Sequence, residues 1–552
     1  MGLKMTSLIK SLSLKNFKGF SDEVCIDLRP ITLLFGANSA GKSSVLQALQ
    51  YVNEVLIGGN LDADSTRHGG QVLGLGGFQN LVHGRDKNKS IEIGILMSLG
   101  DTSMLDSEED EMSDFDSLNE GLQRFEGRLN DFKRRANDVE LRLTVGWSNQ
   151  LNEPIVQEYK VLFNGVWCSE IKASSDGRQA SMKLNGSHPL FMVPQIDFGN
   201  FITETDGFVS PDDLLFDYTL PAMGDARKDG GLVSWLPDVL YELQDNGAEP
   251  AGIGYANWMR AMDGARPKLK AFRIRAPGAK TSESLIWIRL FESFLNWMLY
   301  GPTDTLRMQL SRLRYVGPMR VVPDRGAAMV RRPKLGDWAD GSAAWTTLAN
   351  GSQGLRARVS NWMADRNRLN TGYTVSLRTT REFQIDPVDE EEALGSVGQS
   401  RTRITFKDGA GLEHEPQDVG IGVSQILPVV VAALDSRASL VCVEQPELHV
   451  HPAVQVGLGD LFIEGAVNQG LSFLIETHSE HLILRLLRRI REANDGELLE
   501  GSLGVEPDDV AVHCLSREAG VVRIDRIPIT PDGDFKKRWP QGFFDERGTE
   551  LF

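Results

Sequence analysis

The order of hydrophobic and polar positions divides the chain into segments with different predicted secondary structure. Alternating or continuously apolar stretches in residues 7–17 and 23–36 predict strands, and an apolar stripe at helical spacing in residues 43–56 predicts a helix. Residues 140–200 carry the pattern of short strands and turns, whereas residues 230–315 place tryptophans and leucines at helical spacings. The sequence contains no internal repeat and no sustained heptad pattern, so it predicts a globular fold without a long coiled coil.

The second half of the chain alternates between the two patterns. Strands are predicted near residues 373–407, then helix, strand and helix within residues 424–490, and residues 509–552 are again rich in strand pattern. This mixture favours the α/β fold class. At 552 residues the chain is too long for one ordinary hydrophobic core, so we expect several domains or one domain with a large insertion.

The composition narrows the class of protein. Apolar residues make up 41% and charged residues 24% of the chain, which fits a water-soluble globular protein. We expect no membrane-spanning helix, because no apolar run is long enough for one. The N-terminus lacks a continuous apolar segment and a small-residue cleavage site, which argues against secretion. Four isolated cysteines without a Cys-x-x-Cys pair argue against zinc knuckles and disulfide frameworks, so we expect a reducing, cytoplasmic location.

The net charge of −17 is unevenly distributed along the chain. It argues against a surface that is basic all round, so binding of nucleic acid would require a local basic patch. One candidate is the segment 307–334, which holds eight Lys or Arg residues, Arg320 and Arg325 among them. The opposite extreme is residues 101–117, with eight acidic residues and no basic one. A solvated loop is the favoured interpretation of that acidic run.

One short motif near the N-terminus carries recognisable chemistry. Gly36, four further residues and then Gly41-Lys42-Ser43 lie between a predicted apolar strand and a predicted helix. In this arrangement backbone N–H groups surround phosphate oxygens, and the helix N-terminus adds partial positive charge. Lys42 would then reach the β and γ phosphates of a nucleotide, and the Ser43 hydroxyl would bind Mg²⁺. The predicted phosphate-binding loop, or P-loop, consists of Gly36, Ala37, Asn38, Ser39, Ala40, Gly41, Lys42, Ser43 and Ser44.

Three further motifs follow in the C-terminal third. The turn "DVGIGVSQ" opens an apolar helix, the strand in "LVCVEQPELHVHP" ends at Glu444, and a later strand ends in Thr477-His478-Ser479. In this order and spacing they resemble the signature turn, the Walker B strand and the switch histidine of an ABC-type ATPase head. Together with "LKNFKGF", "YVGPMR" and "PELHVHP", they make the chain most similar to SMC/RecF-like and OLD-like ATPases. The closing "WPQGFF" is similar to ATPase subunits of Septu-type and retron-associated anti-phage systems.

The resemblance implies roles for individual residues. Glu444 takes the place of the Walker B acid that holds Mg²⁺, and His478 that of the histidine that touches the γ-phosphate. A plainer alternative for His478 is a helix-capping turn with Ser479 as the N-cap residue. Gln79 is the candidate for the glutamine of the Q-loop, although Gln71 is an alternative. The signature turn is expected to comprise Gly422, Ser424 and Gln425.

Gln445 is a departure from the family pattern. The residue after the magnesium-binding acid is usually a glutamate that polarises the attacking water, and a glutamine cannot accept a proton at neutral pH. Loss of a general base typically removes about 10²–10⁴-fold of rate. We therefore expect slow ATP turnover, unless Glu447 acts as the base instead. His449 and His451 share one side of the chain, but a turn at the dimer interface explains them better than a metal site.

The resemblance covers residues 8–100 and 310–485, and it implies a dimer of heads with two shared ATP sites, since the signature turn caps the nucleotide of the opposite subunit. The fold class expected from it is an ABC-type P-loop head split by a large mixed α+β insertion, without a long coiled coil. The expected boundaries are 1–100 for the N-terminal part of the head, 101–345 for the insertion, 346–508 for the C-terminal part and 509–552 for a strand-rich tail.

Three functions remain open on sequence grounds. The favoured hypothesis is an ATP- and Mg²⁺-binding oligomer that regulates a separate HNH-type nuclease in prokaryotic anti-phage defence, with DNA or retron RNA/DNA as a further partner. The alternative is a RecF-like repair ATPase that binds DNA directly. A nuclease active on its own is a weaker third hypothesis, because no nuclease constellation stands out and Asp532 and Asp534 fit a Pro-Asp-Gly turn better than a metal site.

Overall fold

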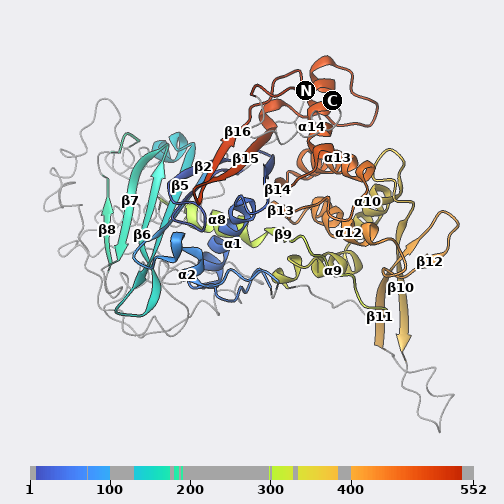
Figure 1. Ribbon diagram of the computed structural model, residues 1–552, viewed down its shortest axis with the longest axis horizontal. Coiled ribbons are helices and arrows are strands. Elements are labelled where there is room, and N and C mark those ends of the chain that lie inside the picture. The colour runs from blue at the N-terminus through green and yellow to red at the C-terminus, as the bar shows by residue number, and fades with distance from the viewer. Residues whose placement is uncertain are drawn as a thin grey trace, which may run out of the picture.

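The computed structural model arranges the part of the chain that it describes around three β-sheets and two hydrophobic cores (Figure 1). Two sheets form the body, and the third is a small sheet that projects from it. The structure describes residues 8–70, 72–99, 130–173, 180–185, 188–190, 297–298, 301–326, 334–382 and 399–537.

The central sheet has six strands in the order β16-β15-β3-β14-β13-β9. Strands β15, β3, β14, β13 and β9 run parallel to one another, and β16 is antiparallel to β15. The P-loop strand β3 is therefore separated from the strand that ends in Glu444 by β14. The strands span Ile31–Gly36 (β3), Arg314–Val316 (β9), Leu440–Glu444 (β13), Ser472–Glu476 (β14), Val510–Glu518 (β15) and Val521–Arg526 (β16).

Helices cover both faces of this sheet, as expected for buried parallel strands. Helix α1 (Lys42–Gly58) packs on one face against β3 and β14, and α13 (Pro452–Gln469) packs against the same two strands from the other face. Helices α12 (Ile421–Leu434) and α14 (Glu480–Asp495) flank α13 (Figure 1). Because side chains alternate along a strand, successive residues of β3, β13 and β14 enter the two cores in turn.

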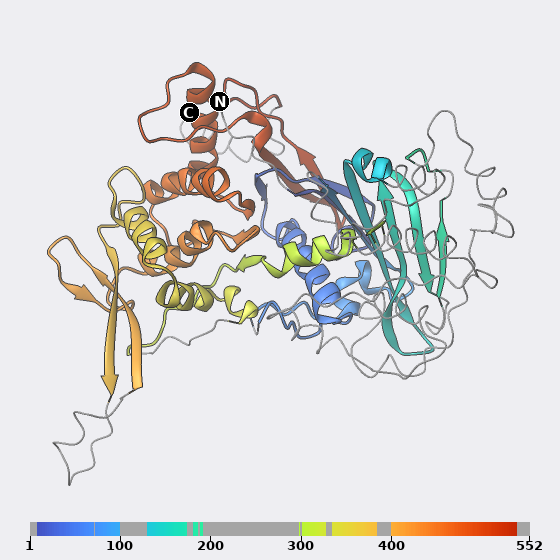
Figure 2. The same cartoon turned by 180° about the vertical axis from the view of Figure 1, so that it is seen from behind.

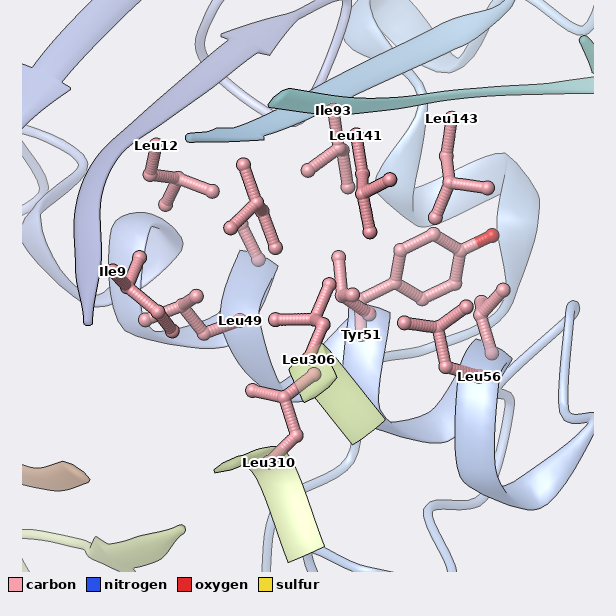
Figure 3. Close-up of a cluster of buried hydrophobic side chains, with 14 of the residues drawn as sticks. Ile9, Leu12, Leu49, Tyr51, Leu56, Ile93, Leu141, Leu143, Leu306 and Leu310 are labelled. Atoms are coloured by element: carbon pink, nitrogen blue, oxygen red, sulfur yellow. The ribbon is translucent and has the colours of Figure 1, made fainter. Parts of the chain in front are cut away.

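The second sheet is antiparallel, with seven strands in the order β2-β1-β4-β5-β6-β7-β8. Its inner face covers α1, and α8 (Gly301–Ser311) packs against both (Figure 3). Leu12, Leu49 and Leu306, from β1, α1 and α8, are all fully buried there, and each such leucine contributes roughly 1.5–3 kcal/mol. The strands span Ile9–Lys15 (β1), Val24–Asp27 (β2), Ile91–Ser98 (β4), Asp138–Ser148 (β5), Glu153–Phe163 (β6), Val166–Ala173 (β7) and Ala180–Leu184 (β8).

The third sheet projects from the body beside α9 and α10 (Figure 2). Its main part is the antiparallel pair β10 and β11, to which the short β12 is added. Phe406 of β11 packs edge-on against Trp345 of α9, which fixes the base of the projection. The elements span Ser342–Asn350 (α9), Gln353–Ala364 (α10), Thr374–Glu382 (β10), Gln399–Lys407 (β11) and Glu413–His414 (β12), and the short helices are Phe78–Leu81 (α2), His83–Arg85 (η1), Leu335–Trp338 (η5) and Pro507–Asp509 (η6).

The α/β fold class and the P-loop head are confirmed, and the longest helix in the described part of the chain, α13, has 18 residues, so that part holds no long coiled coil. The described parts of the segment 101–345 belong to both main sheets, because β5–β8 extend the sheet begun by β1, β2 and β4, and β9 joins the central sheet. Strands β15 and β16, from the expected tail, also belong to the central sheet. The acidic run 101–117, Gln71, "WPQGFF" and most of the predicted helical region 230–300 lie outside the described residues.

A candidate nucleotide and magnesium site

The P-loop connects the end of β3 to the start of α1. Gly36 has a φ of +140°, and a Cβ atom there would lie 2.2 Å from the Leu515 carbonyl oxygen of β15, so only glycine fits. The next three residues, 37–39, are exposed. Helix α1 begins at Lys42 without a side-chain cap. The first N–H groups of the helix therefore face outward beside an accessible loop, where they can donate to phosphate oxygens.

Lys42 is only 3% exposed, and its ammonium lies under the loop. It donates to the carbonyl oxygens of Gly36 and Ala37, both at 3.0 Å. A lysine has three N–H donors, so a third can be directed to a phosphate. Burial lowers the pKa of Lys42, and the nearby carboxylate of Glu476 opposes this effect. The loop thus positions a cation where β and γ phosphates would bind.

Two carboxylates from neighbouring strands lie on the α1 side of the sheet. Glu444 and Glu476 are register partners at the ends of β13 and β14. Cys442 and Leu474, two residues earlier on the same strands, belong to the core that contains α1. Because side chains two residues apart point the same way, both carboxylates face the start of α1.

Glu476 makes the closest contact with the P-loop and was not among the residues expected from the sequence. The Ser43 hydroxyl donates to its Oε2 at 2.6 Å, and its Oε1 lies 3.8 Å from the Lys42 ammonium. Burial raises the pKa of Glu476, whereas the hydrogen bond from Ser43 and the positive charge of Lys42 lower it. The available signal was its position at the end of an apolar strand, directly before Thr477 and His478.

Glu444 is held by a tyrosine from the edge strand β9. The Tyr315 hydroxyl, part of the "YVGPMR" motif, donates to Oε1 of Glu444. Glu444 is 8% exposed, and burial raises its pKa to about 7; the nearby Glu476 adds to the rise, and the bond from Tyr315 opposes it. The only atoms that the side chains of Ser43, Glu444 and Glu476 offer as metal ligands are oxygens. Oxygen ligands are the ones that Mg²⁺ prefers.

Gln445 begins the turn that follows β13. Its φ is +45°, a left-handed conformation, and its backbone N–H donates to the Glu476 carbonyl oxygen at 2.8 Å. The side chain is half-buried. No carboxylate therefore occupies the position directly after Glu444, where a general base was expected.

Glu447 orients the turn that carries His478. Its two carboxylate oxygens accept from the His478 backbone N–H at 2.6 Å and from the Thr477 hydroxyl at 2.9 Å. Glu447 thus supports the His478 turn, and its action as a general base stays an alternative, because each carboxylate oxygen keeps a second lone pair. Burial lowers the pKa of His478, and the charge of Lys42 lowers it further, so the imidazole is neutral at pH 7. Ser479 accepts from the Leu482 N–H at 3.2 Å and is the N-cap of α14.

The predicted signature residues start helix α12. Gly422 lies close to the surface, and a Cβ there would meet the His449 carbonyl oxygen at 2.7 Å. Ser424 is buried and donates to the Pro416 carbonyl at 2.7 Å, and the buried amide of Gln425 donates to the Arg320 carbonyl at 2.5 Å. The structure therefore leaves the N-terminus of α12 accessible, while the side chains of Ser424 and Gln425 serve their own chain.

Arg320 connects helix α12 to the end of β13. Its guanidinium is buried and donates to the carbonyl oxygens of Glu444 at 2.7 Å, Gln445 at 3.2 Å and Gln425 at 3.4 Å. Arg325, by contrast, is exposed and pairs with Asp418. These two arginines of the basic segment thus make intramolecular contacts.

The remaining candidates lie away from these contacts. Gln79 is exposed in α2, so its assignment to a Q-loop stays a prediction. His451 caps α13, accepting from the Ala453 N–H at 3.2 Å. Within the described residues, no three His, Cys, Asp or Glu side chains are placed to hold a metal together, and no helix is long and apolar enough to cross a membrane.

Family models match three parts of the chain. Residues 8–120 match "AAA ATPase domain", residues 324–485 match "AAA domain, putative AbiEii toxin, Type IV TA system", and residues 505–552 match "Protein of unknown function (DUF3696)". The first contains the P-loop, and the second contains the signature turn, Glu444, Glu476 and His478. No curated protein matches the chain.

Solved structures similar to the chain include heads of SMC proteins. One is an SMC head bound to the C-terminal winged-helix domain of ScpA, with 12% identity, 94% of this chain and 97% of that chain covered, and a TM-score of 0.37. Another is the SMC head domain from Thermotoga maritima, with 9% identity, coverage of 95% and 99%, and a TM-score of 0.34. Because these TM-scores are below 0.5, the assignment rests on the family models and the strand order. Both support a P-loop ATPase.

Proposed function

We propose that the chain binds ATP and Mg²⁺ at the P-loop, dimerises around the nucleotide, and hydrolyses it slowly. The observation that carries this proposal is the convergence of Lys42, Ser43, Glu444 and His478 from three segments onto the start of α1, next to a glutamine in the place of the expected base. The exposed loop and the uncapped start of α1 fit the phosphates.

The proposal gives each residue a task. The α1 N–H groups and Lys42 bind the phosphates, and Ser43 and Glu444 would hold Mg²⁺, which when bound neutralises charge on the β and γ oxygens. The neutral His478 contributes a hydrogen bond near the γ-phosphate. Gln445 orients the attacking water through its amide but takes no proton, so the rate remains low.

The position of α12 supports the proposed dimer. Its accessible N-terminus carries partial positive charge and can cap the γ-phosphate of a second subunit. Since the P-loop and this helix terminus lie on one chain, two chains would form two shared sites. Such a long-lived nucleotide-bound dimer suits a regulator of a separate HNH-type nuclease in anti-phage defence better than a motor.

Turnover and oligomeric mass, measured together, test the proposal. We expect the purified chain to form a dimer or larger assembly with ATP and Mg²⁺ and to hydrolyse slowly. Gln445→Glu should raise turnover by about 10²–10⁴-fold, the usual contribution of a general base. The control is Gln353→Glu, which makes the same charge change at an exposed position at the start of α10. Turnover of about 1–10³ s⁻¹ in the native chain, unchanged by the substitution, would contradict slow hydrolysis.

The defence role needs its own test. Cells that carry this chain with a neighbouring HNH nuclease should resist phage, and Lys42→Ala should remove the resistance. The RecF-like alternative predicts instead that the isolated chain binds duplex DNA with steep salt dependence, because phosphate contacts release counterions. The buried Arg320 contacts carbonyl oxygens of its own chain, which removes one of the candidate DNA-binding residues, whereas the exposed Arg325 stays available for the alternative.

A further inference from the structure

The carboxylate of Glu476 is the acidic group in direct contact with the P-loop, and the function proposed above gives it no role. It is 5% exposed, and its Oε2 accepts the proton of the Ser43 hydroxyl at 2.6 Å. Glu444, the expected magnesium acid, is instead engaged by Tyr315. Any account of the site has to explain why a second carboxylate is buried against Ser43.

A hydroxyl that binds a cation does so through an oxygen lone pair, so its proton must point elsewhere. A proton acceptor on the far side of the hydroxyl fixes this orientation and makes the oxygen a better ligand. Glu476 lies at hydrogen-bond distance for that purpose, and its backbone carbonyl also accepts from the Gln445 N–H at 2.8 Å. The residue therefore connects Ser43 to the turn that follows Glu444.

We propose that Glu476 is a positioning residue for magnesium: it accepts the proton of the Ser43 hydroxyl and so holds that oxygen with its lone pairs toward the cation. This inference rests on the proposed function, because it assigns a role within the same nucleotide site. The ion would then lie among Ser43, Glu444 and the β and γ phosphates, with Glu476 directly behind Ser43.

Separating metal-dependent from metal-independent binding of ATP tests the assignment. Binding is measured by calorimetry in EDTA and at increasing Mg²⁺ concentrations. We expect Glu476→Gln to bind ATP in EDTA as well as the native chain or better, because one negative charge near the phosphates is gone. The Mg²⁺ concentration for half-maximal enhancement should rise about 10–100-fold, the usual effect of losing such a supporting group. Electron paramagnetic resonance of Mn²⁺ with ATP should show the same weakening.

Two further variants separate positioning from a structural role. Glu464→Gln neutralises a carboxyl on α13, on the opposite face of the sheet, and should leave the metal dependence unchanged. In a Ser43→Ala background, Glu476→Gln should change the Mg²⁺ requirement much less than in the native chain, since Glu476 acts through that hydroxyl. An equally large effect in both backgrounds contradicts the proposal.

The outcomes distinguish this inference from the proposed function. If Glu476→Gln binds ATP and has the same Mg²⁺ requirement as the native chain, the role of Glu476 is overturned while the proposed function stands. A parallel loss of binding with and without Mg²⁺ shows a structural role and also overturns it. If the native chain binds no ATP in either buffer, the proposed function fails and this inference fails with it.

Discussion

Replacing Glu444 by glutamine should stabilise the chain at alkaline pH while it damages the site. Burial raises the pKa of this carboxyl to about 7, against an ordinary value of 4.5 in the unfolded chain. Between these values the folded chain binds more protons than the unfolded chain, so the free energy of unfolding falls as pH rises. The difference between the two pKa values corresponds to a destabilisation of the folded chain by about 3 kcal/mol. This destabilisation is fully present above pH 7 and nearly absent at pH 4.5. Glutamine carries no charge and therefore avoids this cost. Its side-chain carbonyl can still accept the hydrogen bond from Tyr315.

The assay is thermal unfolding of the native chain and Glu444→Gln without nucleotide or Mg²⁺, at pH 5 and at pH 8. We expect similar melting temperatures at pH 5 and a rise of several degrees for the variant at pH 8. Glu447 and Glu476 also have raised pKa values, but both proteins contain them, so their contributions largely cancel in the comparison. Glu500→Gln, at an exposed position, controls for the loss of one charge.

The reasoning would be refuted by a stability difference that is the same at both pH values, or by a variant that is less stable at pH 8. Either result would mean that the bond from Tyr315 and the surrounding dipoles stabilise the ionised carboxylate more than burial destabilises it. Mg²⁺-dependent ATP binding, measured on the same samples, should be weaker in the variant, since an amide carries no charge toward the cation.

Two other substitutions probe the supports of the site. Arg320→Lys keeps the buried charge but cannot reach all three carbonyl oxygens, so urea denaturation should show a loss of about 2–4 kcal/mol, whereas the exposed Arg325→Lys should leave the midpoint nearly unchanged. Gly36→Ala places a methyl group 2.2 Å from the Leu515 carbonyl and should abolish ATP binding and lower the melting temperature markedly. Gly470→Ala also has a positive φ but open space around it, and should cost only about 1 kcal/mol; equal effects of the two alanines would contradict the steric argument.

Local motifs made the P-loop and its neighbouring strands predictable from the sequence. The Gly-Lys-Ser pattern placed the start of α1, and the apolar runs that end in Glu444 and before His478 placed β13 and β14. These features depend on residues close together in the chain, where periodicity and glycine content act directly.

Pairing between distant strands was not predictable in the same way. The importance of Glu476 becomes visible only once β13 and β14 are in register, since the register sets Glu444 and Glu476 side by side. The continuation of β1, β2 and β4 into β5–β8, and the docking of β9 beside β13, likewise depend on long-range packing that no local pattern encodes. Gln425 was expected in the signature turn and Arg320 in a candidate basic patch, and the buried contact between them depends on the same long-range packing.

Both strands that flank β3 come from the far end of the chain. β14 and β15 pair with β3 on its two sides, and Ser43 and Glu476 are separated by 433 residues. A chain emerging from the ribosome therefore presents its P-loop strand without either neighbour until β14 and β15 have been translated. A chain truncated before β14 would lack both flanking strands and the carboxylate that contacts Ser43, so its P-loop would have no sheet to support it.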